Sequence, residues 1–175
     1  MTATTERLQM ARFGTLTVLF AVVAAASGAA QGAEPAPNTA KAITNTALIE
    51  RGRYLVQIAG CNDCHTPGYV QSGGKVDEKL WLTGDSLGWR GPWGTTYAAN
   101  LRLSLQPMRE EGWIQYARSA KMRPPMPWFA LRDMREDDLR ALYRYIKALP
   151  VTGDRVPAYV KPGETPKGPN VQFPG

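Results

Sequence analysis

Both cysteines of the chain and its only histidine lie together in the motif Cys61-Asn62-Asp63-Cys64-His65. Two thiols separated by two residues are spaced to form thioethers with the two vinyl groups along one edge of a porphyrin, and the adjacent imidazole then lies beneath the metal. A chain that carries this motif must fold around a large planar group. The motif therefore predicts one covalent haem c, attached at Cys61 and Cys64, with His65 as an axial ligand of the iron.

Two other uses of the motif have to be weighed against haem. A redox dithiol of the thioredoxin type normally begins a helix in a strand-helix-strand setting, whereas here a predicted helix runs into the motif. A structural zinc site usually takes four ligands, and the chain has no further Cys or His to complete one. Both alternatives are disfavoured.

The ligand on the opposite side of the iron cannot be a second histidine of the same chain, because His65 is the only one. Met126 lies between Pro125 and Pro127, and two fixed backbone torsions reduce the freedom lost when its sulfur is held at the iron. Met122 lies at the end of the second predicted helix and Met134 at the start of the last, so hydrophobic packing of these helices accounts for both without a role at the iron. The sequence therefore predicts Met126 as the second axial ligand.

The N-terminal residues 1–33 have the pattern of a secretory signal peptide. Arg7 and Arg12 precede an uncharged, mostly apolar run over residues 16–26, and small residues follow up to Ala33. The run is too short for an ordinary membrane span, so we expect cleavage rather than an uncut membrane anchor. Export to the periplasm is the predicted location.

The remaining chain is predicted to form one domain with two appendages, since 175 residues leave little room for two cores. Residues 34–44 have the composition of a flexible leader, and residues 45–150 form the domain. Residues 66–104, rich in Gly and Trp, are expected to form loops around a bulky ligand. Residues 151–175 are rich in proline and are expected to be extended or disordered.

Three helices are predicted in this domain. The first covers residues 46–59, capped by Asn45 or Thr46, and Gly52 inside it suggests close approach of another backbone. The second covers residues 110–121. The third begins after Asp133, with Asp133 and Glu136 as a capping box, and presents one apolar stripe. That stripe consists of Leu139, Leu142, Tyr143, Ile146 and Leu149.

Over residues 46–150 the chain resembles the class I c-type cytochromes. The resemblance rests on the Cys61–His65 motif, on Met126-Pro127 and on the helix that contains residues 138–143. It implies an all-α cytochrome c fold in which the first and last helices cross near the haem, with Gly52 and Tyr143 at the crossing. Residues 91–100 are similar to haem domains in the cytochrome subunit of periplasmic alcohol dehydrogenases.

Aromatic and basic side chains are candidates for the wall of a haem pocket. Buried indole and phenol groups need hydrogen-bond partners, which haem propionates can supply. Arg90 or Arg102 could pair with a propionate. The aromatic candidates are Trp81, Trp89, Trp93, Tyr97 and Trp128.

The resemblance implies a respiratory-chain protein that passes single electrons from a periplasmic dehydrogenase toward a terminal oxidase, and is not itself an enzyme. Removal of residues 1–33, which contain Arg7, Arg12 and Glu6, lowers the net charge from +6 to +5. This modest positive charge suits docking onto an acidic redox partner and gives no reason to infer nucleic-acid binding. One alternative is a haem enzyme or gas sensor with an open or displaceable sixth iron site. Another is an assembly subunit that docks through its tail.

Overall fold

The structure is a computed structural model, and it describes residues 44–174. The predicted signal peptide and nearly all of the predicted leader lie outside these residues. In the described part of the chain, no helix is long and apolar enough to cross a membrane. The elements are α1 Asn45–Ile58, α2 Cys61–His65, the 3-10 helix η1 Glu78–Leu80, β1 Gly88–Gly91, β2 Gly94–Tyr97, α3 Leu101–Ser104, α4 Glu110–Ser119, α5 Trp128–Asp133, α6 Glu136–Ala148 and β3 Asn170–Gln172.

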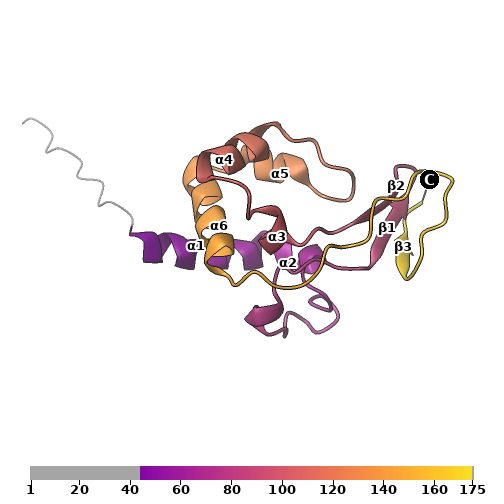
Figure 1. Ribbon diagram of the computed structural model, residues 1–175, viewed down its shortest axis with the longest axis horizontal. Coiled ribbons are helices and arrows are strands. Elements are labelled where there is room, and N and C mark those ends of the chain that lie inside the picture. The colour runs from indigo at the N-terminus through magenta and orange to yellow at the C-terminus, as the bar shows by residue number, and fades with distance from the viewer. Residues whose placement is uncertain (1–43, 175) are drawn as a thin grey trace, which may run out of the picture. The chain divides into compact units, whose positions relative to one another are not determined.

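Helix α6 crosses α1, and the two pack with almost no space between them (Figure 1). A Cβ atom added to Gly52 would lie 2.1 Å from the carbonyl oxygen of Ala141 and 2.6 Å from the Cβ of Tyr145. The predicted close approach of another backbone at Gly52 is therefore confirmed. The expected partner Tyr143 is wrong, because Tyr145 faces Gly52 while the Tyr143 hydroxyl donates to the backbone oxygen of Met108 at 3.0 Å.

The predicted helices are present, but their ends differ from the prediction. Thr44 caps α1 in place of Asn45 or Thr46, since its side chain accepts a hydrogen bond from the Ala47 amide. The predicted capping box of α6 is wrong: the N-cap position is Arg135, without a side-chain cap, and Asp133 instead pairs with Arg132. The second predicted helix ends at Ser119, two residues early, and α5 was not predicted.

A small sheet is present in two regions for which no strands were predicted, the expected loops of residues 66–104 and the tail, which was expected to be extended or disordered. Strands β1 and β2 form an antiparallel hairpin in which Gly91 pairs with Gly94. Strand β3 pairs in parallel with β1, which gives the order β2-β1-β3 (Figure 1). Each strand has only three or four residues, too few for a period-2 pattern to show in the sequence. The all-α cytochrome c fold stays a prediction.

The C-terminal segment after α6 is extended. The sequence predicted that it is either extended or disordered, and the first of these is correct. Its first part is tied to the domain by the Asn100 side chain, which donates to the backbone oxygen of Thr152 at 2.9 Å. Farther along, Val160 forms a bridge with Thr95, the second residue of β2. The segment then returns along β1 as β3. Its prolines prevent a helix but permit these isolated ladder contacts.

A partly buried ion pair also holds α1 and α6 together. The Asp138 side chain, 12% exposed, accepts hydrogen bonds from Arg51 at 2.8 Å and from Arg135 at 3.2 Å. Burial alone raises the pKa of Asp138, but the hydrogen bonds from Arg51 and Arg135 outweigh it and the pKa is lowered. Ionised Asp138 therefore stabilises the folded state.

Asp138→Asn is expected to lower the free energy of unfolding by about 1–2 kcal/mol at pH 7, because both arginines lose a charged partner. The folded-state pKa lies below the unfolded value of about 3.9, so this contribution is complete above that value and is lost as the pH falls through the folded pKa. Denaturant titrations at several pH values measure the difference. The exposed neighbour Asp137→Asn is the control; equal losses in both variants would contradict the role of Asp138.

Candidate functional site

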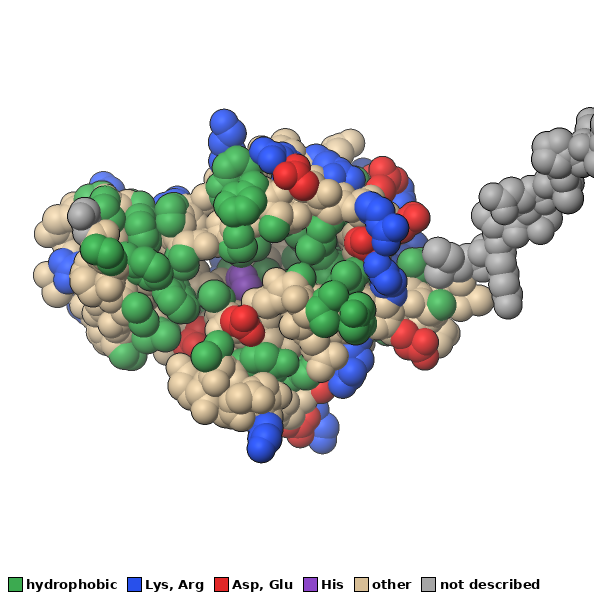
Figure 2. Space-filling view, turned by 180° about the vertical axis from the view of Figure 1, so that it is seen from behind, with side chains coloured by type: hydrophobic (Ala, Val, Ile, Leu, Met, Phe, Trp, Pro, Cys, Tyr) green, Lys and Arg blue, Asp and Glu red, His purple; other side chains and the backbone are tan. Residues whose placement is uncertain are grey.

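A cavity of about 280 Å³ lies between α2, the end of β2, α6 and the segment that joins α4 to α5. We call that segment, residues 120–127, the methionine strap. Figure 2 shows the hollow open to the surface with the only histidine of the chain inside it. Apart from the motif side chains and a few polar atoms, the wall is apolar. Its apolar members include Ala98, Leu101, Leu105, Met108, Trp113, Leu131, Leu142 and Ile146.

Helix α2 carries the motif and is fixed in place by its own side chains. Gly60, with φ of 70°, turns the chain sharply from α1 into α2. Asn62 is fully buried, and its Oδ1 accepts a hydrogen bond from the Thr66 hydroxyl at 2.7 Å. The same hydroxyl oxygen accepts from the amide of Leu82 at 2.8 Å. With Asn62 anchored in this way, Cys61 and Cys64 both line the cavity.

The imidazole of His65 is oriented for metal ligation. Its Nδ1 lies 2.7 Å from the backbone oxygen of Ala99. Because a carbonyl oxygen only accepts, Nδ1 carries the proton and Nε2 keeps its lone pair. Burial lowers the pKa of His65, partly offset by this hydrogen bond, so the ring is neutral. A neutral imidazole with Nδ1 bound to a backbone carbonyl is the usual arrangement of a histidine ligand.

The two thiols are free and are not activated as nucleophiles. Burial raises the pKa of Cys61 to about 11. The pKa of Cys64 is also raised, by burial and then by the charges of Asp63 and Asp85. A redox dithiol depends on a lowered pKa at its attacking cysteine, so this environment disfavours the thioredoxin-type use of the motif.

Three methionines line the cavity, and Met126 differs from the other two. Met108 and Met122 are half-buried and pack against the hydrophobic core. Met126, on the strap, lines the cavity without belonging to that core packing among residues 44–174. Met134 packs on the core and does not line the cavity. Met126, which the sequence predicts as the second axial ligand, is therefore the methionine of the cavity whose thioether does not pack on the core.

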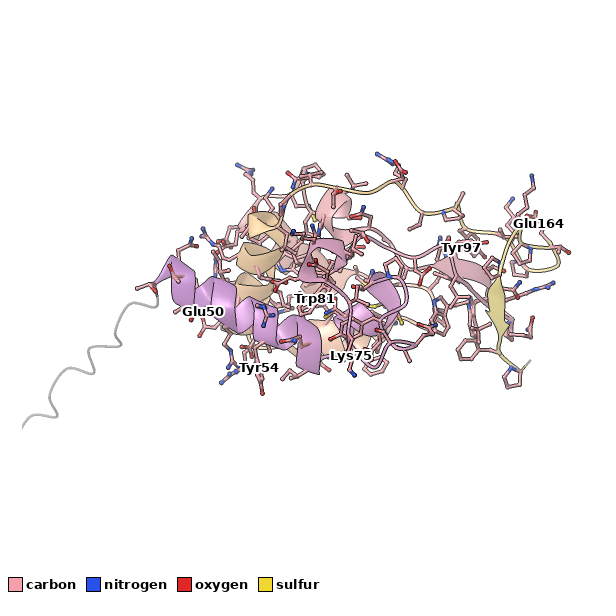
Figure 3. The ribbon with its side chains drawn as sticks, turned by 90° about the horizontal axis from the view of Figure 1, so that it is seen from below. Glu50, Tyr54, Lys75, Trp81, Tyr97 and Glu164 are labelled. Atoms are coloured by element: carbon pink, nitrogen blue, oxygen red, sulfur yellow. The ribbon has the colours of Figure 1, made fainter. Side chains whose placement is uncertain are left out.

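The aromatic wall differs from the expected one. Trp89 and Tyr97 line the cavity, whereas Trp81, Trp93 and Trp128 do not. Figure 3 shows Trp81 beside the helices and Tyr97 on β2. The Trp81 indole donates to the backbone oxygen of Val76 at 2.9 Å and contacts the ring of Tyr69 edge-on.

Two aromatic residues that line the cavity were missed, Trp113 and Tyr116 of α4. Trp113 is buried together with Ile114 and Ala117 on one face of the helix. That apolar spacing was a usable signal in the sequence.

The basic side chain that lines the cavity is Arg123, and not Arg90 or Arg102 as expected from the sequence. Arg102 does not line the cavity, and its buried guanidinium instead donates to the backbone oxygens of Trp81, Pro150 and Glu78 at 2.7, 3.1 and 2.8 Å. Arg90 does not line the cavity. Arg123 of the strap does line the cavity, and no periodic pattern in that part of the sequence predicts it.

Two buried polar atoms of the cavity wall have no hydrogen-bond partner among the described residues. They are the indole Nε1 of Trp89 and the hydroxyl Oγ1 of Thr96. A buried donor without a partner costs about 1–3 kcal/mol, so such groups usually face a ligand or water. An acceptor such as a carboxylate at this end of the cavity would satisfy both.

Across residues 44–174, no cluster of three or more His, Cys, Asp or Glu side chains is arranged to hold a metal ion. The protein ligands that the cavity offers are instead one imidazole and three thioethers, of which that of Met126 lies outside the core packing, with two thiols beside them. Comparison of the chain with protein-family models, with curated proteins and with solved structures gave no match.

Proposed function

We propose that the protein is a periplasmic monohaem c-type cytochrome that transfers single electrons. The observation that carries this proposal is the convergence of Cys61, Cys64, His65 and Met126 on one cavity, although the strap is about sixty residues away from the motif in the sequence. Thioethers at Cys61 and Cys64 would hold one haem c, and His65 and Met126 would supply an imidazole and a thioether as ligands of its iron.

The wall residues fit a haem in two respects. The apolar side chains suit the porphyrin faces, and the unpartnered donors of Trp89 and Thr96 suit its propionates. The cavity volume of about 280 Å³ is close to the lower end of ligand pockets, which span about 300–1,000 Å³. The cavity opens to the surface, which gives a ligand of this kind a way in (Figure 2).

The bound haem would supply reversible one-electron chemistry, and the protein determines how readily it occurs. The Ala99 carbonyl keeps the His65 ring in one orientation, which limits rearrangement at that ligand. The thioether of Met126 and the apolar wall favour the less charged, ferrous state and so a raised reduction potential. These are the properties of an electron carrier.

The proposed donor is a periplasmic dehydrogenase and the proposed acceptor is a terminal oxidase or another cytochrome. Support comes from the resemblance of residues 91–100 to haem domains of alcohol dehydrogenase subunits. In the structure these residues contain the end of β1, all of β2 and the Ala99 carbonyl that orients His65. The net charge, +6 for the whole chain and +5 without the three charged residues of the predicted signal peptide, supports docking onto acidic partners.

Carbon monoxide tests this function against the haem enzyme or gas sensor. With both axial positions occupied by protein, the reduced holoprotein should keep its absorption spectrum when carbon monoxide is added, and a potentiometric titration should fit one reversible electron. A rapid spectral change on adding the gas would show an open or displaceable sixth site and would favour the alternative.

A further inference from the structure

The C-terminal tail contacts the methionine strap through one stacked pair. The guanidinium carbon of Arg123 lies 3.9 Å from the centre of the Tyr159 ring, well within the range of about 6 Å for a cation–π contact. Arg123 lines the cavity and precedes Met126 by three residues. A residue of the tail therefore reaches the segment that carries the proposed ligand.

Tyr159 is held firmly on the side of the hairpin. Its hydroxyl donates to the backbone oxygen of Trp93 at 2.7 Å. The next residue, Val160, exchanges two backbone hydrogen bonds with Thr95, at 2.8 and 3.1 Å. A Cβ at Gly94 would lie 2.3 Å from the Val160 oxygen, so the tail lies directly on the hairpin backbone. The hairpin therefore holds the Tyr159 ring in the position where it stacks on Arg123.

The strap has few other attachments. Residues 121–125 make no hydrogen bond, from backbone or side chain, to any other described residue. Lys121, Arg123 and Pro124 are exposed, and Met122 is the strap residue that packs on the core. The stacking of Arg123 on Tyr159 is therefore a principal contact between this segment and a fixed part of the protein.

We propose that Tyr159 is a positioning residue that acts through Arg123 to keep the sulfur of Met126 facing the cavity. The inference rests on the proposed function, since it concerns the strength with which the sulfur stays at the haem iron. Loss of the stack frees the strap to move away, and Met126 then dissociates from the iron more often. The tail is thereby part of the machinery that holds the ligand.

The test measures how fast external imidazole displaces methionine in the ferric holoprotein, followed by the loss of the far-red absorption band that methionine ligation produces. Tyr159→Leu and Arg123→Gln should each accelerate displacement by about three- to tenfold, the range expected for loss of one partly exposed cation–π contact. The double variant should be no faster than either single variant, because both remove the same contact. A merely structural role of the tail does not predict this coupling.

Two controls separate stacking from general loosening. Tyr159→Phe keeps the aromatic face and loses only the hydrogen bond to Trp93, so it should remain within about twofold of the wild type. Arg132→Gln removes another cation–π pair, in which the guanidinium carbon lies 5.3 Å from the centre of the Trp128 ring beyond the other end of the strap, together with the ion pair to Asp133, and it should have no effect.

Unchanged displacement rates in Tyr159→Leu and Arg123→Gln, in a wild type that shows the band, would overturn this inference and leave the proposed function standing. Additive effects in the double variant would also overturn it. If Tyr159→Leu does not fold, Arg123→Gln against Arg132→Gln decides the matter alone. A wild type without the methionine band would overturn the proposed function itself, and this inference with it.

Discussion

Replacing Cys61 and Cys64 together with alanine is expected to reduce covalently bound haem from one per chain to none. Each thiol lines the cavity beside His65, and the chain has no other cysteine to take its place. A single replacement leaves one possible thioether and should leave attachment weakened but detectable. The measurement is the haem absorbance that stays with the polypeptide after denaturation and chromatography, in a host that attaches c-type haem.

Asp63→Asn is the matched control for the cysteine variants. Asp63 lies between the two cysteines in the same short helix but is exposed and does not line the cavity. Its replacement should leave haem attachment intact. Haem retained by the double cysteine variant, or absent from the wild type, would mean that the motif does not attach haem.

Gly52→Ala is expected to cost about 3 kcal/mol or more in the free energy of unfolding, which is a large part of the roughly 5–15 kcal/mol that stabilises a typical domain. The added Cβ would lie 2.1 Å from a backbone oxygen of α6, which cannot move aside as a flexible side chain could. The helices would have to separate at the place where Leu55, Val56 and Leu142 are buried. Thermal or denaturant unfolding of the holoprotein measures the loss.

Gly112→Ala provides the control for the glycine substitution, because Gly112 also lies within a helix, α4, but a Cβ there has nothing within 4 Å. The intrinsic preference of alanine for helices should stabilise this variant by about 0.5–1 kcal/mol. Similar effects of the two substitutions would contradict the close packing of α1 on α6.

The long helices could be predicted because their apolar periodicity extends over several turns. The apolar stripe of α6 and the apolar residues of α1, the helix that precedes the motif, were both visible in this way. Gly52 also stood out, because glycine is unfavourable inside a helix unless another group packs closely against it. The helix ends were predicted less well. Caps depend on the dihedral angles of one residue, and Thr44 and Asn45 are equally good candidates by composition.

The sheet and the tail contacts could not be predicted, since they depend on pairing between distant segments. Strand β3 is separated from β1 by about eighty residues, and neither has the length to show alternation. Arg102 illustrates the same limit within the site. Its guanidinium satisfies three backbone oxygens that meet only in the folded chain, so residue type alone made it a false candidate for a propionate.

The far-red absorption spectrum of the purified ferric holoprotein tests the central claim most directly, because the weak band of methionine-ligated low-spin haem reports the sixth ligand. We predict that the wild type shows this band, that Met126→Ala loses it with a fall in midpoint potential on the order of tenths of a volt, and that Met108→Ala and Met122→Ala keep it. These two control methionines line the same cavity. A wild type without the band, or a Met126→Ala variant that retains it, would contradict ligation by Met126.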